Sequence, residues 1–439
     1  MTRAISYVVF SLAVFGSAGA VTSERKDDVL QQLLRSAQAQ APSARIADAF
    51  EIQRRYDAQA AWFQLLPRLE TSASYRRNDP VVDFELPAAP DKDSDVITFT
   101  PQNQLEASVQ LEVPLLHWSA FARVLEADNE SDSARLFAVA ERLKLERRVA
   151  AAYHAWIGAD ALAQANTRAL RVAEEASVVV RARAEAGTVT TLERSRAEAE
   201  VERARARAAD AEELRISAAR RLTTLCATAL PSTPTLDPDP LLPERPLDGW
   251  LADAKRLPGV AAAAAAAEAA SARAVGVWAT LAPNLSAVAA ERLTNANGFG
   301  PVNTFYAGLQ VRWALDASVA SRALSAQAGV IAAQARTQAA VEDAREAIEE
   351  AWQRVHARSA KLIAARRVLA ASQEAAGAAH ERFEAGSLSL LDVVSADRDV
   401  LLADVELIQA ELDVKQARVD LRIAAGQGLL DTAQQGGGA

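Results

Sequence analysis

An internal duplication constrains the fold of this chain more than any other feature of its sequence. Two prolines and a tryptophan of the first half recur in the second half with a constant separation of 216 residues: Pro42, Trp62 and Pro67 return as Pro258, Trp278 and Pro283. A further match pairs RARAEAGTVTTLE at 181–193 with HERFEAGSLSLLD at 380–392, now 199 residues apart. Three anchors at one separation are hard to obtain by chance, so the sequence predicts two copies of one structural unit.

The duplication divides the chain into five predicted parts. Residues 1–20 are interpreted as a secretory signal peptide, because a basic start and a short apolar stretch lead to small residues at a cleavage site. The first repeat is predicted over 21–229 and the second over 248–428. Between them, 230–247 contains six prolines, which are incompatible with a helix and indicate a linker. Residues 429–439 are predicted to be a flexible tail.

Both repeats are predicted to follow one plan: helix, strand, loop, strand, very long helix, turn and returning helix. The very long helices are expected over 118–184 and 317–384, each ~100 Å long at the helical rise per residue. The returning helices, over 188–226 and 387–426, are little more than half as long, and so is the first helix, over 27–66. Two short helices placed end to end would therefore match one long helix.

The loop between the two strands differs in length between the copies. In the first copy it covers 76–104 and is rich in Pro and Asp, whereas its counterpart over 292–304 is short and contains Asn-Gly. Both compositions are typical of loops. The first copy is therefore predicted to carry an enlarged loop.

Apolar residues recur every seven positions along the second long helix, at Val341, Ile348, Val355, Leu362, Leu369, Ala376 and Phe383. The last helix shows apolar residues at spacings of three, four and seven, at Leu391, Val394, Leu401, Val405, Ile408, Leu412 and Val419. Such spacing is typical of coiled coils, in which an apolar seam is buried against neighbouring helices. A soluble coiled-coil rod would show the same pattern, so the heptads leave that alternative open.

Two segments alternate between apolar and polar residues. The apolar positions are Leu105, Ala107, Val109, Leu111, Val113 and Leu115 in the first copy and Phe305, Ala307, Leu309, Val311, Trp313 and Leu315 in the second. Segments of ~10 residues with one apolar face suit the strands of a membrane β-barrel. Their weaker partners are expected over 69–75 and 285–291. A strand that covers a soluble core would look the same locally, but the signal peptide and the very long helices favour the membrane.

The composition argues against a compact enzyme and against nucleic-acid binding. Aromatic residues are only 5% of the chain, runs rich in Ala, Glu, Arg and Leu indicate extended helices, and the formal net charge is −9. The histidines are scattered without a second metal ligand at the required spacing; they are His117, His154, His356 and His380. The sequence has no phosphate-binding loop or nucleophile elbow. We therefore expect no catalytic residue, no metal site and no cofactor.

Several stretches resemble the TolC-like outer membrane factors. RFEAGSLSLLDVVSADRDVLLADVEL (382–407) is similar to the family's turn and following helix, and VQLEVPLLHWSAFARV (109–124) to its exit from the second strand. LADAKRLPGVAAAAAAAEAA (251–270) is similar to the helix start between its repeats. The resemblance covers nearly the whole chain after the signal peptide, although His117 stands where Asp is commoner and Ala184 replaces an aromatic residue. It implies a mainly α-helical fold in which a long coiled-coil helical barrel continues into a membrane β-barrel completed by trimerisation.

The resemblance also implies an outer-membrane exit duct of a tripartite efflux or type I secretion system in a Gram-negative bacterium. Three chains would each give four strands to one twelve-stranded barrel, and their helices would form a tunnel across the periplasm. The two turns would lie at the periplasmic tip and dock onto a periplasmic adaptor protein linked to an inner-membrane pump; they are Ala186-Gly187-Thr188 and Ala385-Gly386-Ser387. The cargo, which can be a drug, a metal ion or a polypeptide in such ducts, is not indicated by the sequence.

The residues of the turns suggest how the chain reverses direction at the tip. Glycine after a helix permits a left-handed turn without steric cost. Thr188 and Ser387 are then predicted to cap the helices that follow.

A candidate gate follows these turns. Asp392 and Glu193 are equivalent across the repeat, and in a trimer each would form a ring of three carboxylates that attracts cations at a constriction. Phe383 aligns with an aromatic residue of the family's gate, but Leu388 stands where the family has Arg and Ser395 where it has a second Asp. The alternative interpretation, that both acids only favour a helix N-terminus, remains open.

Two other classes of protein share some of these features. A periplasmic adaptor also uses a long helical hairpin, but generally only one, between β-rich domains. A structural coiled-coil protein would share the heptads. An inner-membrane helical transporter is excluded, because after the signal peptide no window of about 18 predominantly apolar residues lacks charge.

Overall fold

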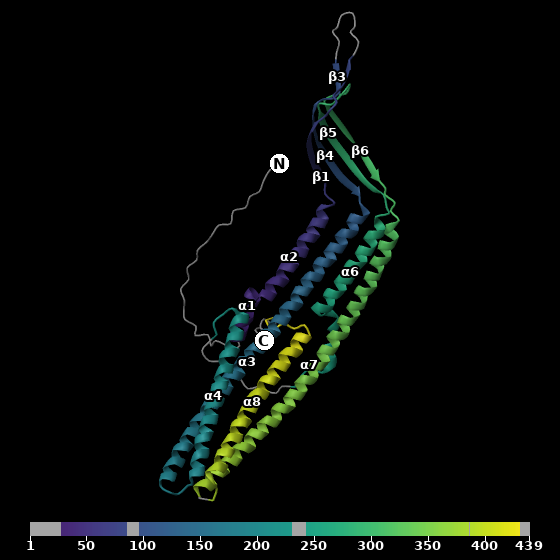
Figure 1. Ribbon diagram of the computed structural model, residues 1–439. Coiled ribbons are helices and arrows are strands. Elements are labelled where there is room, and N and C mark those ends of the chain that lie inside the picture. The colour runs from purple at the N-terminus through teal and green to yellow at the C-terminus, as the bar shows by residue number, and fades with distance from the viewer. Residues whose placement is uncertain (1–27, 86–95, 231–242, 386, 431–439) are drawn as a thin grey trace, which may run out of the picture.

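The computed structural model describes residues 28–85, 96–230, 243–385 and 387–430. The predicted signal peptide and most of the predicted linker and tail lie outside the described residues. The molecule is elongated, with a β-sheet at one end and two helical turns at the other (Figure 1).

Two very long helices run through most of this length. They are α3 (Trp118–Glu185) and α7 (Ser318–Glu384), of 68 and 67 residues. In the half nearer the sheet, α2 (Pro42–Phe63) packs against α3, and α6 (Pro258–Ala279) packs between α3 and α7. The lateral order of helices in this half is therefore α2-α3-α6-α7.

The half nearer the tip uses the returning helices. α4 (Thr191–Cys226) packs against α3, and α8 (Leu390–Ala424) packs between α3 and α7. The order here is α4-α3-α8-α7. The predicted placement of two shorter helices along each long one is confirmed (Figure 1).

The first helix does not run unbroken over 27–66 as predicted. It is divided into α1 (Asp28–Gln40) and α2, with Ala41 in an extended conformation between them. Pro42 explains the break, because a proline disfavours the helical conformation of the residue before it while fitting well at the first position of a new helix.

The heptad seam predicted for α7 is buried along the middle of the helix. Ile348, Val355 and Leu362 are at most 1% exposed, and they face α8 and the segment that precedes α6. In α8 the predicted seam faces α3 and α4, and its Leu412 is 8% exposed. The residues packed against α7 are a different set, which includes Ala410, Val414, Ala417 and Leu421. Small and branched residues at these positions let α8 approach α7 closely, whereas Val405, Ile408 and Leu412 line a space between α3, α4 and α8.

The sheet is antiparallel, with the strand order β1-β4-β5-β6. Its strands are β1 (Arg68–Arg77), β4 (Asn103–Leu116), β5 (Asn284–Thr294) and β6 (Asn303–Arg312). Each repeat contributes one hairpin, and β4 pairs with β5 across the repeats. β1 and β6 are the outer strands, so each has one edge without a partner strand in the described chain.

The register places the two predicted apolar patterns on one face of the sheet. Leu69 lies opposite Leu111, which lies opposite Ala289, which lies opposite Ala307. The apolar side chains on this face are largely uncovered, and Leu309 is 71% exposed. β6 ends at Arg312, earlier than predicted, so Trp313 and Leu315 follow the strand instead of belonging to it.

The enlarged segment 76–104 was predicted to be a loop, but part of it is a second small sheet. β2 (Val82–Glu85) pairs with β3 (Val96–Thr100). Phe84 and Phe99 both contact Phe299 of the β5–β6 loop edge to face, with ring centroids 6.0 and 5.2 Å apart. The β2–β3 hairpin of the first repeat is thereby fixed against the loop of the second.

Two apolar clusters thicken the molecule at mid-length. In one, Leu34 of α1 packs with Leu145 of α3 and Leu222 of α4. Cys226 belongs to this cluster, and burial raises the pKa of its thiol to about 11. In the other, α5 (Leu247–Leu251) and a 3₁₀ turn (Ala254–Arg256) pack against α7. Both clusters lie at the level where α2 and α6, the short helices nearer the sheet, give way to α4 and α8, the short helices nearer the tip.

The segment Leu247–Ala279 is apolar enough, by length and composition, to cross a membrane. It is the one such helical segment in the part of the chain that the structure describes. Its apolar character comes mainly from alanines, and α6 packs between α3 and α7. Helix packing explains this composition without a membrane, since small side chains allow neighbouring helices to approach closely.

A buried carboxylate ties both ends of the described chain to α3. Glu146 is 4% exposed, accepts a hydrogen bond from Gln38 Nε2 in α1 at 2.8 Å, and accepts another from the backbone N–H of Leu429 at 2.6 Å. Two donors on one buried anion compensate for its lost hydration.

Substitution Glu146→Gln is expected to loosen α1 and the C-terminal segment by roughly 1–3 kcal/mol, because the amide N–H₂ would oppose a donor. Hydrogen exchange of residues 28–40 and 425–430 measures this loss of protection. Glu141→Gln is the matched control, since Glu141 is on the same helix but bonds only the exposed Lys144 among described residues. Unchanged exchange in Glu146→Gln would contradict the assignment.

Candidate functional site at the helical tip

The two turns that reverse the chain lie at the end of the molecule opposite the sheet (Figure 1). In the first, α3 ends at Glu185, Ala186 remains helical and Gly187 adopts a left-handed φ of 72°. The N–H of Thr188 donates to the carbonyl of Arg183 at 3.0 Å, and its hydroxyl donates to the same carbonyl at 2.9 Å. This pattern closes the helix as expected for a glycine after its C-terminus.

The second turn repeats this closure. α7 ends before Ala385, and Ser387 donates its N–H at 2.9 Å and its hydroxyl at 3.0 Å to the carbonyl of Arg382. Gly386 lies outside the described residues. The two turns are thus equivalent in the hydrogen bonds that can be compared.

The predicted caps of the returning helices were wrong. Thr188 and Ser387 bond backward to the preceding helix, and the residues that cap α4 and α8 are Thr190 and Ser389. Both caps are extended, with φ −78° and ψ near 155°, and both form a complete capping box. One residue lies between Thr188 and the cap Thr190, and one between Ser387 and the cap Ser389. The hydroxyls of Thr188 and Ser387 are therefore too far from the next helix to cap it.

Glu193 and Asp392 are the acidic partners in these boxes. Glu193 Oε2 accepts from the N–H of Thr190 at 2.8 Å, and Asp392 Oδ2 accepts from the hydroxyl of Ser389 at 2.6 Å. Each carboxylate therefore stabilises the start of a helix. Both residues remain exposed, so capping does not withdraw their charge from solvent.

Phe383 lies between the two hairpins and is half-buried. The guanidinium of Arg183, from the last turn of α3, sits 4.9 Å from the centre of its ring. This cation–π contact joins the first repeat to the second. Sequence reasoning missed Arg183, although a signal was available: Arg183 is the repeat equivalent of Arg382, one position before the aligned aromatic residue.

A cavity of about 610 Å³ separates the hairpins beside this contact. Its charged lining includes Arg196, Arg203 and Glu200 of α4, together with Glu193. Partial burial acts to raise the pKa of Glu200, but hydrogen bonds from Arg207 and Arg203 outweigh it and hold this pKa below its usual value. The carboxylate therefore stays ionised near neutral pH, and the cavity is lined by ion pairs and apolar side chains.

The histidines lie apart from this cavity. His154 bonds Gln416, His356 bonds the carbonyl of Trp352, and His380 bonds Asp397. No group of three His, Cys, Asp or Glu residues that could hold a metal ion occurs within the described ranges.

The chain matches the family described as outer membrane efflux protein over residues 33–228 and 254–427, which are nearly all of the two repeats. The chain belongs to the outer membrane efflux protein family. The resemblance to TolC-like factors is thereby confirmed, and the adaptor and coiled-coil rod alternatives are set aside. Members of this family are channels of the Gram-negative outer membrane and not enzymes, and this chain is such an efflux channel.

Solved structures agree with this fold. The channel is similar to VceC from Vibrio cholerae, with 19% identity, a TM-score of 0.75 and coverage of 91% of this chain and 96% of that one. The CmeC channel of Campylobacter jejuni is 16% identical, with a TM-score of 0.76 and coverage of 97% of this chain and 96% of that one. The open state of MtrE from Neisseria gonorrhoeae is 22% identical, with a TM-score of 0.75 and coverage of 95% of each chain. Among curated proteins, none matches by sequence.

Substitution Thr190→Ala in this efflux channel is expected to weaken the first turn of α4 by about 1 kcal/mol, because the N-cap bond is lost. Hydrogen exchange of residues 191–196 should then be roughly fivefold faster. The matched substitution Thr188→Ala removes a hydroxyl that bonds backward to α3 and should leave this turn unchanged. Equal effects of the two substitutions would contradict the cap assignment.

Proposed function

We propose that three copies of this chain close into one continuous duct that carries cargo out through the outer membrane. The observation that carries this proposal is the pair of open edges on β1 and β6. An unpaired strand edge exposes backbone N–H and C=O groups, which cannot be satisfied by lipid, so a sheet in a bilayer must close on itself. Sharing the sheet among copies satisfies both edges at once.

The helical layer supports the same closure. Its outer helices are α2 and α4 on one side and α7 on the other, which are the sides that carry β1 and β6. One rotation about a common axis would therefore join sheet to sheet and helix layer to helix layer. The family's trimeric assemblies fit this arrangement.

The tip would form the periplasmic entrance of the duct. With three copies around one axis, Asp392 and Glu193 each supply three exposed carboxylates, and Phe383 supplies an aromatic residue behind them. Such rings attract cations and repel anions at a constriction. In this role the capping bonds described above hold each carboxylate in place, so structural and gating roles are compatible.

The turns themselves are the proposed docking site for a periplasmic adaptor, which would connect the duct to an inner-membrane pump. They consist of small residues beside a glycine: Ala186, Gly187, Thr188, Ala385, Gly386 and Ser387. Small side chains leave the backbone accessible, which favours close contact with the tip of another helical hairpin. An inner-membrane pump would supply the energy, since a passive duct has none.

Substitution Leu309→Arg is expected to reduce assembly of trimers in the outer membrane, because a charge on the lipid face of a barrel strand costs roughly 2–4 kcal/mol. Gln310→Arg, on the opposite face of the same strand, should be tolerated. Light scattering of detergent-extracted channel measures the yield of particles with three chains. A soluble monomer, or equal yields from both variants, would contradict the proposal, since Leu309 is solvent-exposed in a single chain.

Substitution Asp392→Asn is expected to lower the cation-to-anion permeability ratio of the channel in planar bilayers, roughly fivefold at low salt. Ser389→Ala is the matched control, because it breaks the capping box while keeping the carboxylate. A gate predicts that only Asp392→Asn changes ion preference. A purely structural role predicts no change in either variant, or the same change in both.

A further inference from the structure

A large hollow lies in the half nearer the sheet, far from the tip. It has a volume of about 1360 Å³ and is bordered by α2, α3, α6 and α7. We call it the four-helix trough. It plays no part in the gate or the docking site proposed above.

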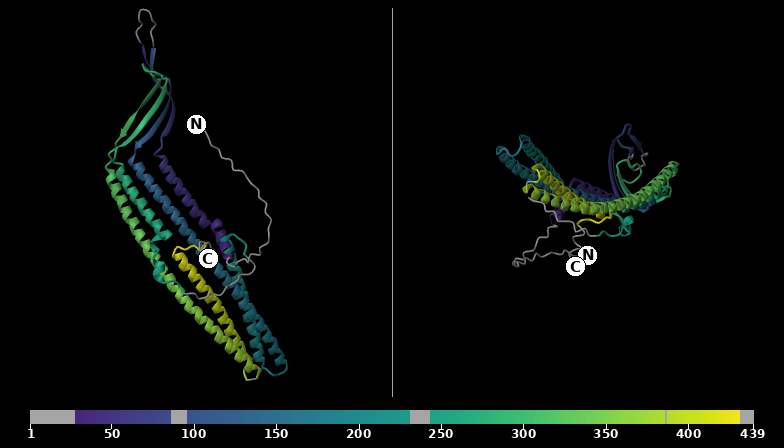
Figure 2. Two further views of the ribbon diagram at one scale, coloured as in Figure 1. Left: turned by 180° about the vertical axis from the view of Figure 1, so that it is seen from behind. Right: turned by 90° about the horizontal axis from the view of Figure 1, so that it is seen from below.

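The trough lies on the concave face of the helical layer. The lateral order α2-α3-α6-α7 makes α2 and α7 the outer helices, and residues of both border the same hollow. Side chains from both outer helices of a curved layer can converge only on its inner side, and the curvature is visible from below (Figure 2). If the chain closes into the proposed trimer, this face lines the duct, although the trough itself is complete within one chain.

One wall of the trough is apolar and aromatic. Phe50 and Phe137 meet edge to face with ring centroids 6.3 Å apart, and Ile46 beside them is 70% exposed. Across the hollow, the floor has glycines where a side chain would have room. A Cβ added at Gly259 or Gly329 would meet no heavy atom within 4 Å.

Most of the charges bordering the trough are already compensated. Glu130 accepts from both Arg54 and Arg273, each at 2.9 Å. The remaining pairs are Arg322 with Asp316 at 2.7 Å and Glu141 with Lys144 at 2.7 Å.

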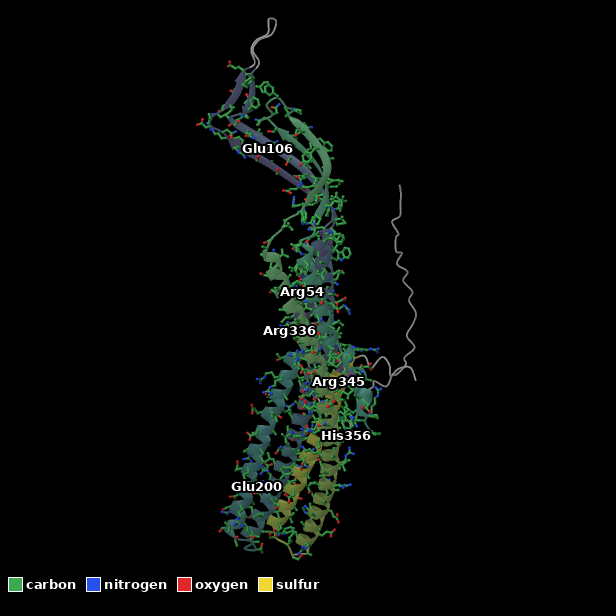
Figure 3. The ribbon with its side chains drawn as sticks, turned by 90° about the vertical axis from the view of Figure 1, so that its right-hand side faces the viewer. Arg54, Glu106, Glu200, Arg336, Arg345 and His356 are labelled. Carbon is green, nitrogen blue, oxygen red and sulfur yellow. The ribbon has the colours of Figure 1, made fainter. Side chains whose placement is uncertain are left out.

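Arg336 of α7 is the exception. It is exposed, borders the trough and makes no ion pair within the described residues (Figure 3). A hollow with apolar walls and one uncompensated cation has the character of a ligand site with a single orienting charge.

We propose that the four-helix trough binds amphipathic organic anions, with the acid group on Arg336 and the apolar body against Phe50 and Phe137. A guanidinium offers a planar pair of donors that matches a carboxylate or sulfonate. The alanine and glycine floor accepts a flat or elongated apolar body. Such a site would hold one class of cargo at the wall of the duct between entrance and barrel.

The probe for this site is anilinonaphthalene sulfonate, an aromatic anion, compared with N-phenylnaphthylamine, which has the same rings without the sulfonate. Calorimetric titration of the channel in lipid nanodiscs, with empty nanodiscs as the blank, measures saturable binding. We expect the anion to bind roughly tenfold more tightly than the neutral probe, as one charge-assisted interaction implies. Absence of saturable binding, or equal affinity for both probes, would overturn the proposal.

Arg336→Gln should weaken binding of the anion roughly tenfold and leave the neutral probe unchanged. Arg345→Gln is the matched control: nine residues along α7 is half a turn beyond two full turns, so Arg345 lies on the opposite face of the helix (Figure 3). Equal anion affinity in Arg336→Gln and the unmodified channel would overturn the assignment of Arg336.

Gly329→Leu tests the apolar part of the site independently. Leucine favours a helix more than glycine does, and a Cβ at position 329 would meet no heavy atom within 4 Å. Both probes should then bind more weakly, because the side chain occupies the trough. Unchanged binding of both would place the probes elsewhere. Because the trough is complete in one chain, weak binding with intact trimers and conductance would refute this site alone and leave the duct standing.

Discussion

The requirement that no backbone edge remain unpaired in lipid governs this architecture. A single chain makes a four-stranded sheet with two open edges. The helical layer beneath it is also open at two sides, with α2 and α4 at one side and α7 at the other. The helical layer continues the strands without a change of order, since β1 leads from α2, β4 into α3, β5 from α6 and β6 into α7. Closing the sheet therefore determines how the helices meet, down to the tip.

In the half nearer the tip, apolar burial holds the helices together, whereas charged side chains fix their relative positions. The seam between α7 and α8 excludes water completely at Leu362, Ala410 and Val414, and this burial supplies most of the attraction. Exposed ion pairs add little each. Asp420 of α8 is different, because it is 10% exposed and accepts from Arg147 of α3 and Arg354 of α7. A carboxylate held from both sides fixes the position of α8 along its neighbours.

The sequence predicted the features that repeat along the chain. It did not predict details that depend on contacts between distant segments. The duplication, the long helices and the strand alternation each extend over many residues, so small local errors do not change the interpretation. The spacing of apolar residues in α8 could not tell which neighbour each of them meets, because one set faces α7 and the other faces the space beside α3. Arg183 was missed because its partner Phe383 is in the other repeat. The caps were misassigned because Thr188 and Thr190 are equally plausible until the hydrogen bonds are seen.

The carboxylate of Glu146 makes the middle of the molecule depend on segments that are far apart in the sequence. It accepts hydrogen bonds from Gln38 of α1 and from the backbone N–H of Leu429, which follows α8. Both segments therefore meet on one buried side chain of α3. A change that displaces either segment would take a hydrogen bond from a buried anion, and so it would also weaken the contact of the other segment with α3.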